Sequence, residues 1–163
     1  LESGKLELRL MPMDLDATIR EVIESLRWQA RAKRQAINYT SPASATGQVQ
    51  GDSARLHQVV ANLLSNAIKF SPPGETISVA LARTDANVEL SVRDRGAGIE
   101  ASDVPRLFAP FQRLATHPTA GESSHGLGLS IAQEIVRRHG GTIRVESQPG
   151  AGATFIVALP VSA

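Results

Sequence analysis

The sequence predicts a two-layer α/β sandwich in which three helices cover one face of a mixed, largely antiparallel sheet. Three stretches carry apolar residues at helical spacing, and between them lie runs in which apolar and polar residues alternate as they do in strands. Two pairs of these runs flank short turn sequences, which indicates antiparallel hairpins. With 163 residues, 42% of them hydrophobic, the chain has enough apolar material for one core in one domain.

The composition excludes several kinds of protein. The 17 basic and 16 acidic side chains leave a formal net charge of +1, so we expect no binding to nucleic acid and no membrane contact. The absence of cysteine excludes disulfides, thiolate metal sites and a cysteine nucleophile. The longest stretches without a charged residue, 35–51 and 147–163, are not the apolar run of ~20 residues that a membrane helix needs. No signal peptide is recognisable, and we expect a cytoplasmic location.

The first predicted elements are strands around one helix. Alternating leucines at 6–10 predict a short strand that stops near Pro12. Asp14 is then expected to cap a first amphipathic helix of about twenty residues. Residues 37–40 and 48–50 are short strand candidates on either side of a loop rich in Ser, Pro, Ala and Gly.

A second helix and a hairpin follow. Asp52 is expected to cap the helix, which runs to about Phe70 and is ended by the Pro-Pro-Gly sequence at 72–74. Residues 76–83 and 88–94 alternate apolar and polar side chains around a four-residue turn, which predicts a hairpin.

The last third begins with an irregular region and ends in regular structure. Three prolines interrupt the pattern over 96–125, and a stretch of roughly 25 residues is too long for a mere connection, which favours a functional lid or a disordered loop. A third helix is predicted from about Leu127 to His139. Residues 142–146 and 154–159 predict a closing hairpin.

Two asparagines and a lysine share one face of the second predicted helix. At ~100° per residue, Asn62, Asn66 and Lys69 fall within an arc of about 60°, with Phe70 at its edge. They offer neutral oxygens for a hard cation and a positive charge for phosphate. An ordinary solvated face is the alternative, although Asn is a poor helix former and two on one face invite a reason.

A glycine motif, Asp-Arg-Gly-Ala-Gly-Ile at 94–99, directly follows a predicted strand. Glycine permits positive φ and close backbone approach to a ligand. Residues 96–101 also fit the dinucleotide pattern G-x-G-x-x-[GA], which requires a helix next and an acidic residue at the end of a second strand. Pro105 and Pro110 interrupt that helix and no strand lies near Thr116, so the dinucleotide interpretation fails. A plain tight turn remains the alternative.

A second glycine motif, His-Gly-Leu-Gly-Leu-Ser at 125–130, opens the third predicted helix. Glycines before a helix amino terminus supply free N–H groups and the positive end of the helix dipole, which suits an anion. No G-x-x-x-x-G-K-[ST] sequence exists in the chain, so this is not a P-loop. An ordinary glycine-rich helix start is the alternative.

In their order and context, these motifs resemble the conserved boxes of sensor histidine kinases. Residues 62–70 resemble the N box, 94–99 the G1 box, 108–111 the F box and 126–129 the G2 box. Residues 140–160 resemble that family's carboxy-terminal hairpin, so the resemblance covers nearly the whole chain.

The resemblance implies a Bergerat (GHKL) fold, in agreement with the predicted sandwich, and a catalytic domain that binds ATP and Mg²⁺. It implies Asn66 as the Mg²⁺ ligand, with Asn62 and Lys69 as catalytic residues near the phosphates. Phe70 would line the nucleotide, with core packing as the alternative for this ring and for Phe108. Asp94 would accept a hydrogen bond from the adenine amino group.

Further nucleotide contacts are implied around the two glycine boxes. The first two glycines would let the backbone approach the base and would hinge an ATP lid at about 99–125. The G2 residues would offer N–H groups to the phosphates. A threonine would help the base contact through water. These implied positions are Gly96, Gly98, Ile99, Gly126, Leu127, Gly128, Leu129 and Thr154.

The resemblance also implies what lies outside the chain. Histidine kinases transfer the γ-phosphoryl group to an H-box histidine, which is followed by an acidic residue and, four residues on, by proline. The chain's histidines lack that context: His57, His117, His125 and His139. We therefore expect 1–5 to be the remnant of a linker from a missing dimerisation and phosphoacceptor domain, and 6–160 to be the catalytic domain. Expected partners are ATP or ADP, the histidine-containing dimerisation domain and a response regulator. The fragment is expected to be a monomer and its parent a homodimer, with membrane anchoring of the parent left open.

Two departures and two alternatives accompany this interpretation. The first departure is His125, which stands where family members often carry Thr or Ser. The second is that the lid has no basic residue after Arg113, so a basic contact to phosphate must come from Arg106 or Arg113 or be missing. One alternative is a GHKL ATPase or anti-sigma serine kinase, but these often carry a Glu where this chain has Asn62, and without it a general base is lacking. The other is a pseudo-kinase that binds partners and no nucleotide.

Overall fold

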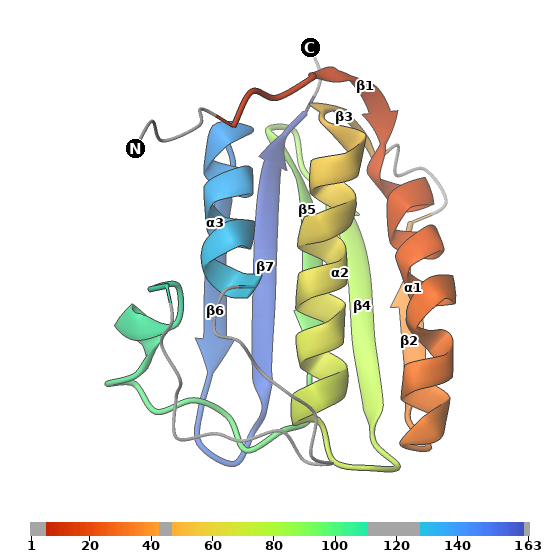
Figure 1. Cartoon of the computed structure of the whole chain (residues 1–163), viewed down its shortest axis with the longest axis vertical. Coiled ribbons are helices and arrows are strands. Elements are labelled where there is room, and N and C mark those ends of the chain that lie inside the picture. Colours follow the sequence, from red (N-terminus) through yellow and green to blue (C-terminus); the bar gives the residue numbers. More distant parts are fainter. Residues whose placement is uncertain (1–5, 43–46, 111–127, 162–163) are drawn as a thin grey trace.

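The computed structural model describes residues 6–42, 47–110 and 128–161, and it confirms the predicted sandwich (Figure 1). Three helices lie side by side over one face of a five-stranded sheet: α1 (Leu15–Ala32), α2 (Ser53–Phe70) and α3 (Gly128–Arg138). The strand order is β2-β4-β5-β7-β6, in which β2 runs parallel to β4 and the other neighbours are antiparallel. The bounds of these strands are β2 (Ala36–Thr40), β4 (Thr76–Arg83), β5 (Asn87–Arg93), β6 (Thr142–Ser147) and β7 (Ala153–Pro160).

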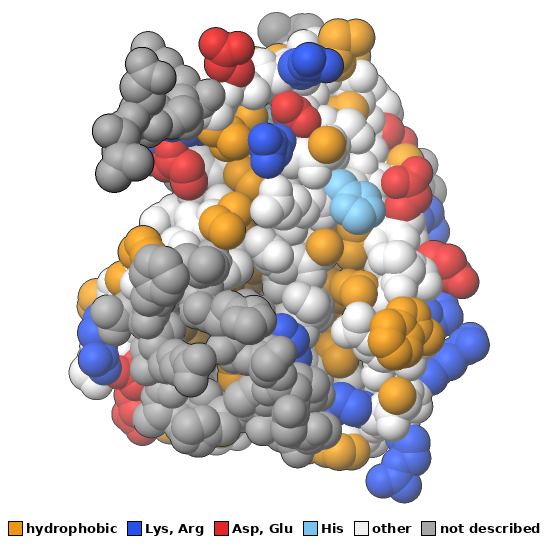
Figure 2. Space-filling model, viewed as in Figure 1, with side chains coloured by type: hydrophobic (Ala, Val, Ile, Leu, Met, Phe, Trp, Pro, Cys, Tyr) orange, Lys and Arg blue, Asp and Glu red, His pale blue; other side chains and the backbone are white. Residues whose placement is uncertain are grey.

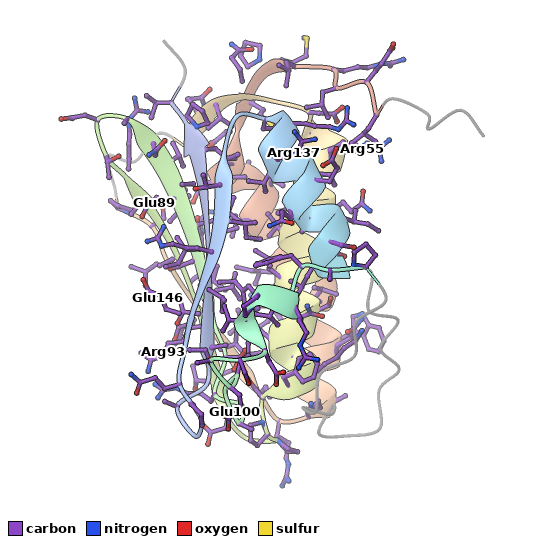
Figure 3. All side chains as sticks on the ribbon, turned by 90° about the vertical axis from the view of Figure 1, so that its left-hand side faces the viewer. Arg55, Glu89, Arg93, Glu100, Arg137 and Glu146 are labelled. Atoms are coloured by element: carbon purple, nitrogen blue, oxygen red, sulfur yellow. The ribbon has the colours of Figure 1, made fainter. Side chains whose placement is uncertain are left out.

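Strand alternation decides which side chains meet the helices. Strands β4 and β5 bury every second residue against them, as Val79 and Leu90 illustrate with 2% and 1% of their surface exposed, whereas β7 is buried continuously over 155–159. The intervening residues face outward, and Figure 3 shows Glu89 and Glu146 on the side of the sheet away from the helices. The core therefore lies between the two layers, and the outer sheet face is mostly polar, apart from Ile156 and Ala158 of β7.

Both predicted helix caps are confirmed. The side chain of Asp14 accepts a hydrogen bond from the N–H of Asp16, and that of Asp52 accepts one from the N–H of Arg55. Each satisfies one of the N–H groups that the first turn of a helix leaves without a partner. The sequence rule for helix starts therefore held for α1 and α2.

The predicted strand at 6–10 is wrong. The strand in this region is β1 (Met11–Asp14), which includes Pro12 and pairs antiparallel with β3 (Gln48–Gly51) in a separate two-stranded sheet. Proline is tolerated there because β1 has only one neighbour and needs no N–H on its free side. The leucine segment is instead held by helix ends, since Arg138 donates to the carbonyl of Leu6.

The predicted irregular region is only partly described. Up to Pro110 it contains one 3-10 turn, η1 (Val104–Arg106). The rest of the predicted lid lies outside the described residues, as do the linker remnant 1–5 and several positions singled out in the sequence: Phe111, Arg113, His117, His125, Gly126 and Leu127. Over the described ranges, no helix combines the length and apolar character needed to cross a bilayer.

Candidate functional site

The central helix α2 carries the polar face that the sequence predicts. Asn62, Asn66 and Lys69 are all half-buried, whereas Leu63 and Ala67 on the other side of the helix are buried in the core. The helical period therefore puts the two amides and the ammonium group in one row along the surface of α2, as predicted.

The first amide of this row joins α2 to α3. Nδ2 of Asn62 donates to the carbonyl oxygen of Gly128, 3.0 Å away. A Cβ at Gly128 would lie 3.6 Å from Cγ of Asn62, so the two helices approach closely at this glycine. Gly128 is the first residue of α3, and its N–H is one of the donors that the helix itself cannot satisfy. The structure thus brings the asparagine face and the second glycine motif together.

The second amide is open to a ligand. Within the residues that the structure describes, no hydrogen bond of the Asn66 side chain is seen, so its carbonyl oxygen is available as a neutral ligand for a cation. The half-buried Phe70 ends the same helix, one turn further on.

The carboxylate of Asp94 is buried and held in one orientation. Only 7% of the residue is exposed, and Oδ1 accepts hydrogen bonds from the N–H groups of Gly96, at 2.9 Å, and Ala153, at 3.1 Å. Burial raises the pKa of Asp94, while these two backbone hydrogen bonds act in the opposite direction. Oδ2 accepts no hydrogen bond from any described residue. One oxygen is therefore anchored and the other is available to an N–H donor.

The loop after Asp94 is attached to the turn between β6 and β7. Gly98 has φ of +78°, and a Cβ there would collide with the carbonyl oxygen of Gln148. Oγ of Ser147 accepts from the N–H of Ile99 and donates to the carbonyl oxygen of Gly152, both at 2.8 Å. The sequence analysis missed Ser147, and nothing in its local pattern distinguishes it from an ordinary strand-end serine.

The same loop is also attached to the end of α2. Oγ of Ser71, which is fully buried, accepts a hydrogen bond from the N–H of Arg95 at 3.0 Å. A Cβ on Gly96 would lie 2.6 Å from the carbonyl oxygen of Phe70, so only glycine permits this approach. Asp94 therefore has a fixed place relative to the asparagine face of α2. Ser71 was also missed, because nothing in the local sequence distinguishes it from any other residue that follows a helix.

The structure does not bring Thr154 to Asp94. Thr154 pairs with Arg93 across the two strands, and Figure 3 shows Arg93 at the outer side of the sheet. Its neighbour Phe155 faces the helices, where its ring meets that of Phe108 edge-on at 6.4 Å. The backbone of Ala153, rather than the threonine hydroxyl, contacts the carboxylate. The F-box ring of Phe108 accordingly packs on the core.

Some of the remaining predicted positions lie within the described residues and others do not. Gly128 and the half-buried Leu129 begin α3, whereas Gly126 and Leu127 lie outside the description. Arg106, one of the two candidates for a basic phosphate contact, forms an ion pair with Asp103 on the 3-10 turn. The described site thus has an oriented carboxylate, an open amide and a helix start.

Comparisons with known proteins agree with this geometry. Residues 51–163 match the family described as histidine kinase-, DNA gyrase B-, and HSP90-like ATPase. The sensor-like histidine kinase SenX3 of Mycobacterium tuberculosis is 39% identical over 148 residues, which are 91% of this chain and 36% of that protein. The chain thus spans little more than a third of the length of this relative.

Solved structures give the same result. The mycobacterial sensor histidine kinase MprB superimposes with a TM-score of 0.81 at 32% identity, covering 92% of this chain and 97% of that one. Full-length ShkA, crystallised in complex with AMPPNP, superimposes with a TM-score of 0.84 at 27% identity, covering 98% of this chain and 33% of that one.

Proposed function

This chain belongs to the family of histidine kinase-, DNA gyrase B-, and HSP90-like ATPases, and we propose that it is the ATP- and Mg²⁺-binding catalytic domain of a sensor histidine kinase. In this proposal residues 6–160 form the catalytic domain, with a lid at about 99–125, and 1–5 belong to a linker. The domain donates the γ-phosphoryl group of ATP to a histidine on a separate dimerisation domain, from which a response regulator receives it. Two of the similar proteins, SenX3 and MprB, are named as sensor or sensor-like histidine kinases.

The observation that carries the proposal is the orientation of Asp94. Two backbone N–H groups hold Oδ1, and Oδ2 accepts no hydrogen bond from the described residues. A free carboxylate oxygen in a buried position suits a donor such as the exocyclic amino group of adenine, and it disfavours a purine with an oxygen at that position. Asp94 is therefore proposed as the residue that selects adenine.

The polar face of α2 is proposed to serve the phosphates. Asn66 is the proposed Mg²⁺ ligand, because its amide oxygen is half-buried and open. Among the described residues no group of three His, Cys, Asp or Glu side chains is placed to hold a metal. A site with one protein oxygen suits Mg²⁺, which keeps waters and substrate phosphates as its other ligands. When bound, the ion neutralises phosphate charge. Lys69 adds a positive charge on the same face.

The proposed chemistry needs no nucleophile from this chain. Phosphoryl transfer depends mostly on positioning and charge neutralisation. Asn62 contributes through its hydrogen bond to Gly128, which holds the start of α3, where N–H groups would face the phosphates. Asn62 has no carboxylate to activate water, so efficient ATP hydrolysis is not expected. This disfavours an ATPase of the gyrase or Hsp90 type.

The acceptor histidine is proposed to lie outside this chain. Of the two histidines in the described part, His57 lies on α2 and His139 directly follows α3. Both ring nitrogens of His139 are engaged: Nε2 accepts from the N–H of Asp52 at 3.0 Å, and Nδ1 lies 2.7 Å from the carbonyl oxygen of Ile135. Neither histidine has an H-box context.

Phosphotransfer in trans tests the proposal. The chain is mixed with histidine-containing dimerisation domains from several close relatives and with γ-labelled ATP, and the acceptor is examined for acid-labile, base-stable label. We expect label on the acceptor histidine with wild type and none with Asp94→Asn. If no folded acceptor is labelled although the chain still binds an ATP analogue, kinase activity is rejected. The chain would then be a pseudo-kinase that acts by binding partners.

A further inference from the structure

At the carboxyl end of α2, the two prolines that follow the helix deprive two carbonyl groups of their regular donors. In an α-helix each carbonyl accepts from the N–H four residues on. For Ile68 and Lys69 those residues are Pro72 and Pro73, which have no N–H. The last regular bond of the helix runs from the N–H of Ser71. The proline pair that ends α2 therefore leaves two buried or half-buried acceptors to be satisfied from elsewhere.

Two side chains from the end of α1 satisfy these acceptors. Nζ of Lys33 donates to the carbonyl oxygens of Ile68, at 2.7 Å, and Lys69, at 3.1 Å. Nε2 of Gln35 donates to Ile68 at 3.1 Å and to Ser71 at 2.8 Å. Lys33 and Gln35 are 8% and 5% exposed. An ammonium group beside helix carbonyls also meets the negative end of the helix dipole. We call these two residues the α2 clamp.

The clamped segment is the one that contacts the loop after Asp94. Ser71 receives the N–H of Arg95, and the carbonyl of Phe70 lies against Gly96. The N–H of Gly96 in turn donates to the carboxylate of Asp94. A continuous series of hydrogen bonds and close contacts thus runs from the buried ammonium to the base-selecting carboxylate.

We propose that Lys33 and Gln35 are positioning residues of the nucleotide site, which fix the end of α2 against the loop that orients Asp94. This inference rests on the proposed function only for its consequence in binding, because the attachment itself exists without nucleotide. A displacement of the carboxylate by a fraction of an ångström would weaken an oriented hydrogen bond to the base. The clamp therefore acts on the base contact through the Asp94 loop, and it also holds the carbonyl of Lys69 at the phosphate side.

The test replaces Lys33 by methionine, which keeps the length of the side chain and removes its donors. Arg31→Met is the matched control, because Arg31 is exposed in the last turn of the same helix and the variant loses the same charge. Figure 2 shows the basic side chains that gather near this edge of the helix face. Unfolding curves establish that each variant folds, and the affinities are compared among folded proteins.

The first measurement needs no nucleotide. We expect Lys33→Met to speed hydrogen exchange of the Arg95 amide by about tenfold or more, because that N–H is held by the clamped segment. Arg31→Met should leave it unchanged. Unchanged protection of Arg95 in a folded Lys33→Met protein would overturn the proposal, whether or not the chain binds ATP.

The second measurement is a double-mutant cycle on ADP affinity. Lys33→Met should weaken the binding of adenosine, which has no phosphate, as well as that of ADP, by about tenfold, and it should add little to Asp94→Asn, because both changes act on the base contact. Losses that multiply would show that Lys33 acts independently of Asp94, against the proposal. If Lys33→Met does not fold, Gln35→Met takes its place, because it removes the clamp's other donor to the carbonyl oxygens of Ile68 and Ser71. A wild-type chain that binds no ADP would instead refute the proposed function.

Discussion

The junction between the Asp94 loop and the β6–β7 turn gives a quantitative prediction for Gly98→Ala. Gly98 has φ of +78°, and an added Cβ would meet the carbonyl oxygen of Gln148 and lie 2.8 Å from its carbonyl carbon. Both partners are backbone atoms, so neither can move aside by a change of rotamer. The matched control is Gly150→Ala, because Gly150 has φ of +80° and no atom within 4 Å of the added Cβ.

The two substitutions share one cost and differ in another. A left-handed conformation costs a residue with a Cβ about 1 kcal/mol, and this applies to both positions. Only Gly98→Ala also forces backbone segments apart, which costs a further 1–3 kcal/mol by the usual range for overpacking, or about 2–4 kcal/mol in total. We therefore expect Gly150→Ala to lose about 1 kcal/mol and Gly98→Ala to lose clearly more.

Urea unfolding of the two variants beside wild type measures this difference. The same proteins are then titrated with ADP, and we expect Gly98→Ala alone to bind more weakly, because the loop that it displaces carries Asp94. Equal losses of unfolding free energy in the two variants would refute the inferred close approach to Gln148. Equal ADP affinities would show that this approach does not position the site.

Three further outcomes follow from single groups. Since burial raises the pKa of Asp94, ADP affinity should fall as the pH drops from neutrality through that raised pKa, whereas a flat profile would argue against an ionised acceptor. Asp52→Ala should lower the free energy of unfolding by about 1 kcal/mol. The N–H of Arg9 holds the pKa of Asp52 below its ordinary value. The loss of unfolding free energy in Asp52→Ala is therefore full at pH values above the pKa of Asp52 in the unfolded chain, and it disappears as the pH falls through the lower pKa of the folded protein. Urea unfolding curves at several pH values measure this dependence. Asn62→Ala should lower the free energy of unfolding by about 1 kcal/mol and speed hydrogen exchange of the amides at the start of α3, since it removes the hydrogen bond to Gly128. Unchanged exchange there would contradict the inference that Asn62 holds the start of α3.

The regular elements could be predicted because their signals are local. Asp14 and Asp52 cap helices where a polar side chain precedes an apolar period, and the proline pair ends α2 as expected. The strand expected at 6–10 failed because alternation alone does not say whether a partner strand lies beside it. Its leucines alternate, but that segment is bound to helix ends through Arg138 and Asp52.

The candidate site was predictable where one side chain has one role, and not where the role arises from packing. The family resemblance is confirmed by the comparison, and Asp94 lies in an environment suited to its expected contact. Ser71, Ser147 and Lys33 escaped notice because each acts on backbone atoms that are distant in sequence. The motif also does not reveal that Thr154 pairs with Arg93 while the backbone of its neighbour Ala153 contacts Asp94.

The central claim is that Asp94 selects adenine, and a paired titration tests it most directly. Wild type and Asp94→Asn are each titrated with ADP and with inosine diphosphate, which carries an oxygen in place of the amino group. We predict that wild type prefers ADP by at least about tenfold, as expected for a buried hydrogen bond, and that the preference disappears in Asp94→Asn. Equal binding of the two nucleotides by wild type, or an unchanged preference in the variant, would contradict the account.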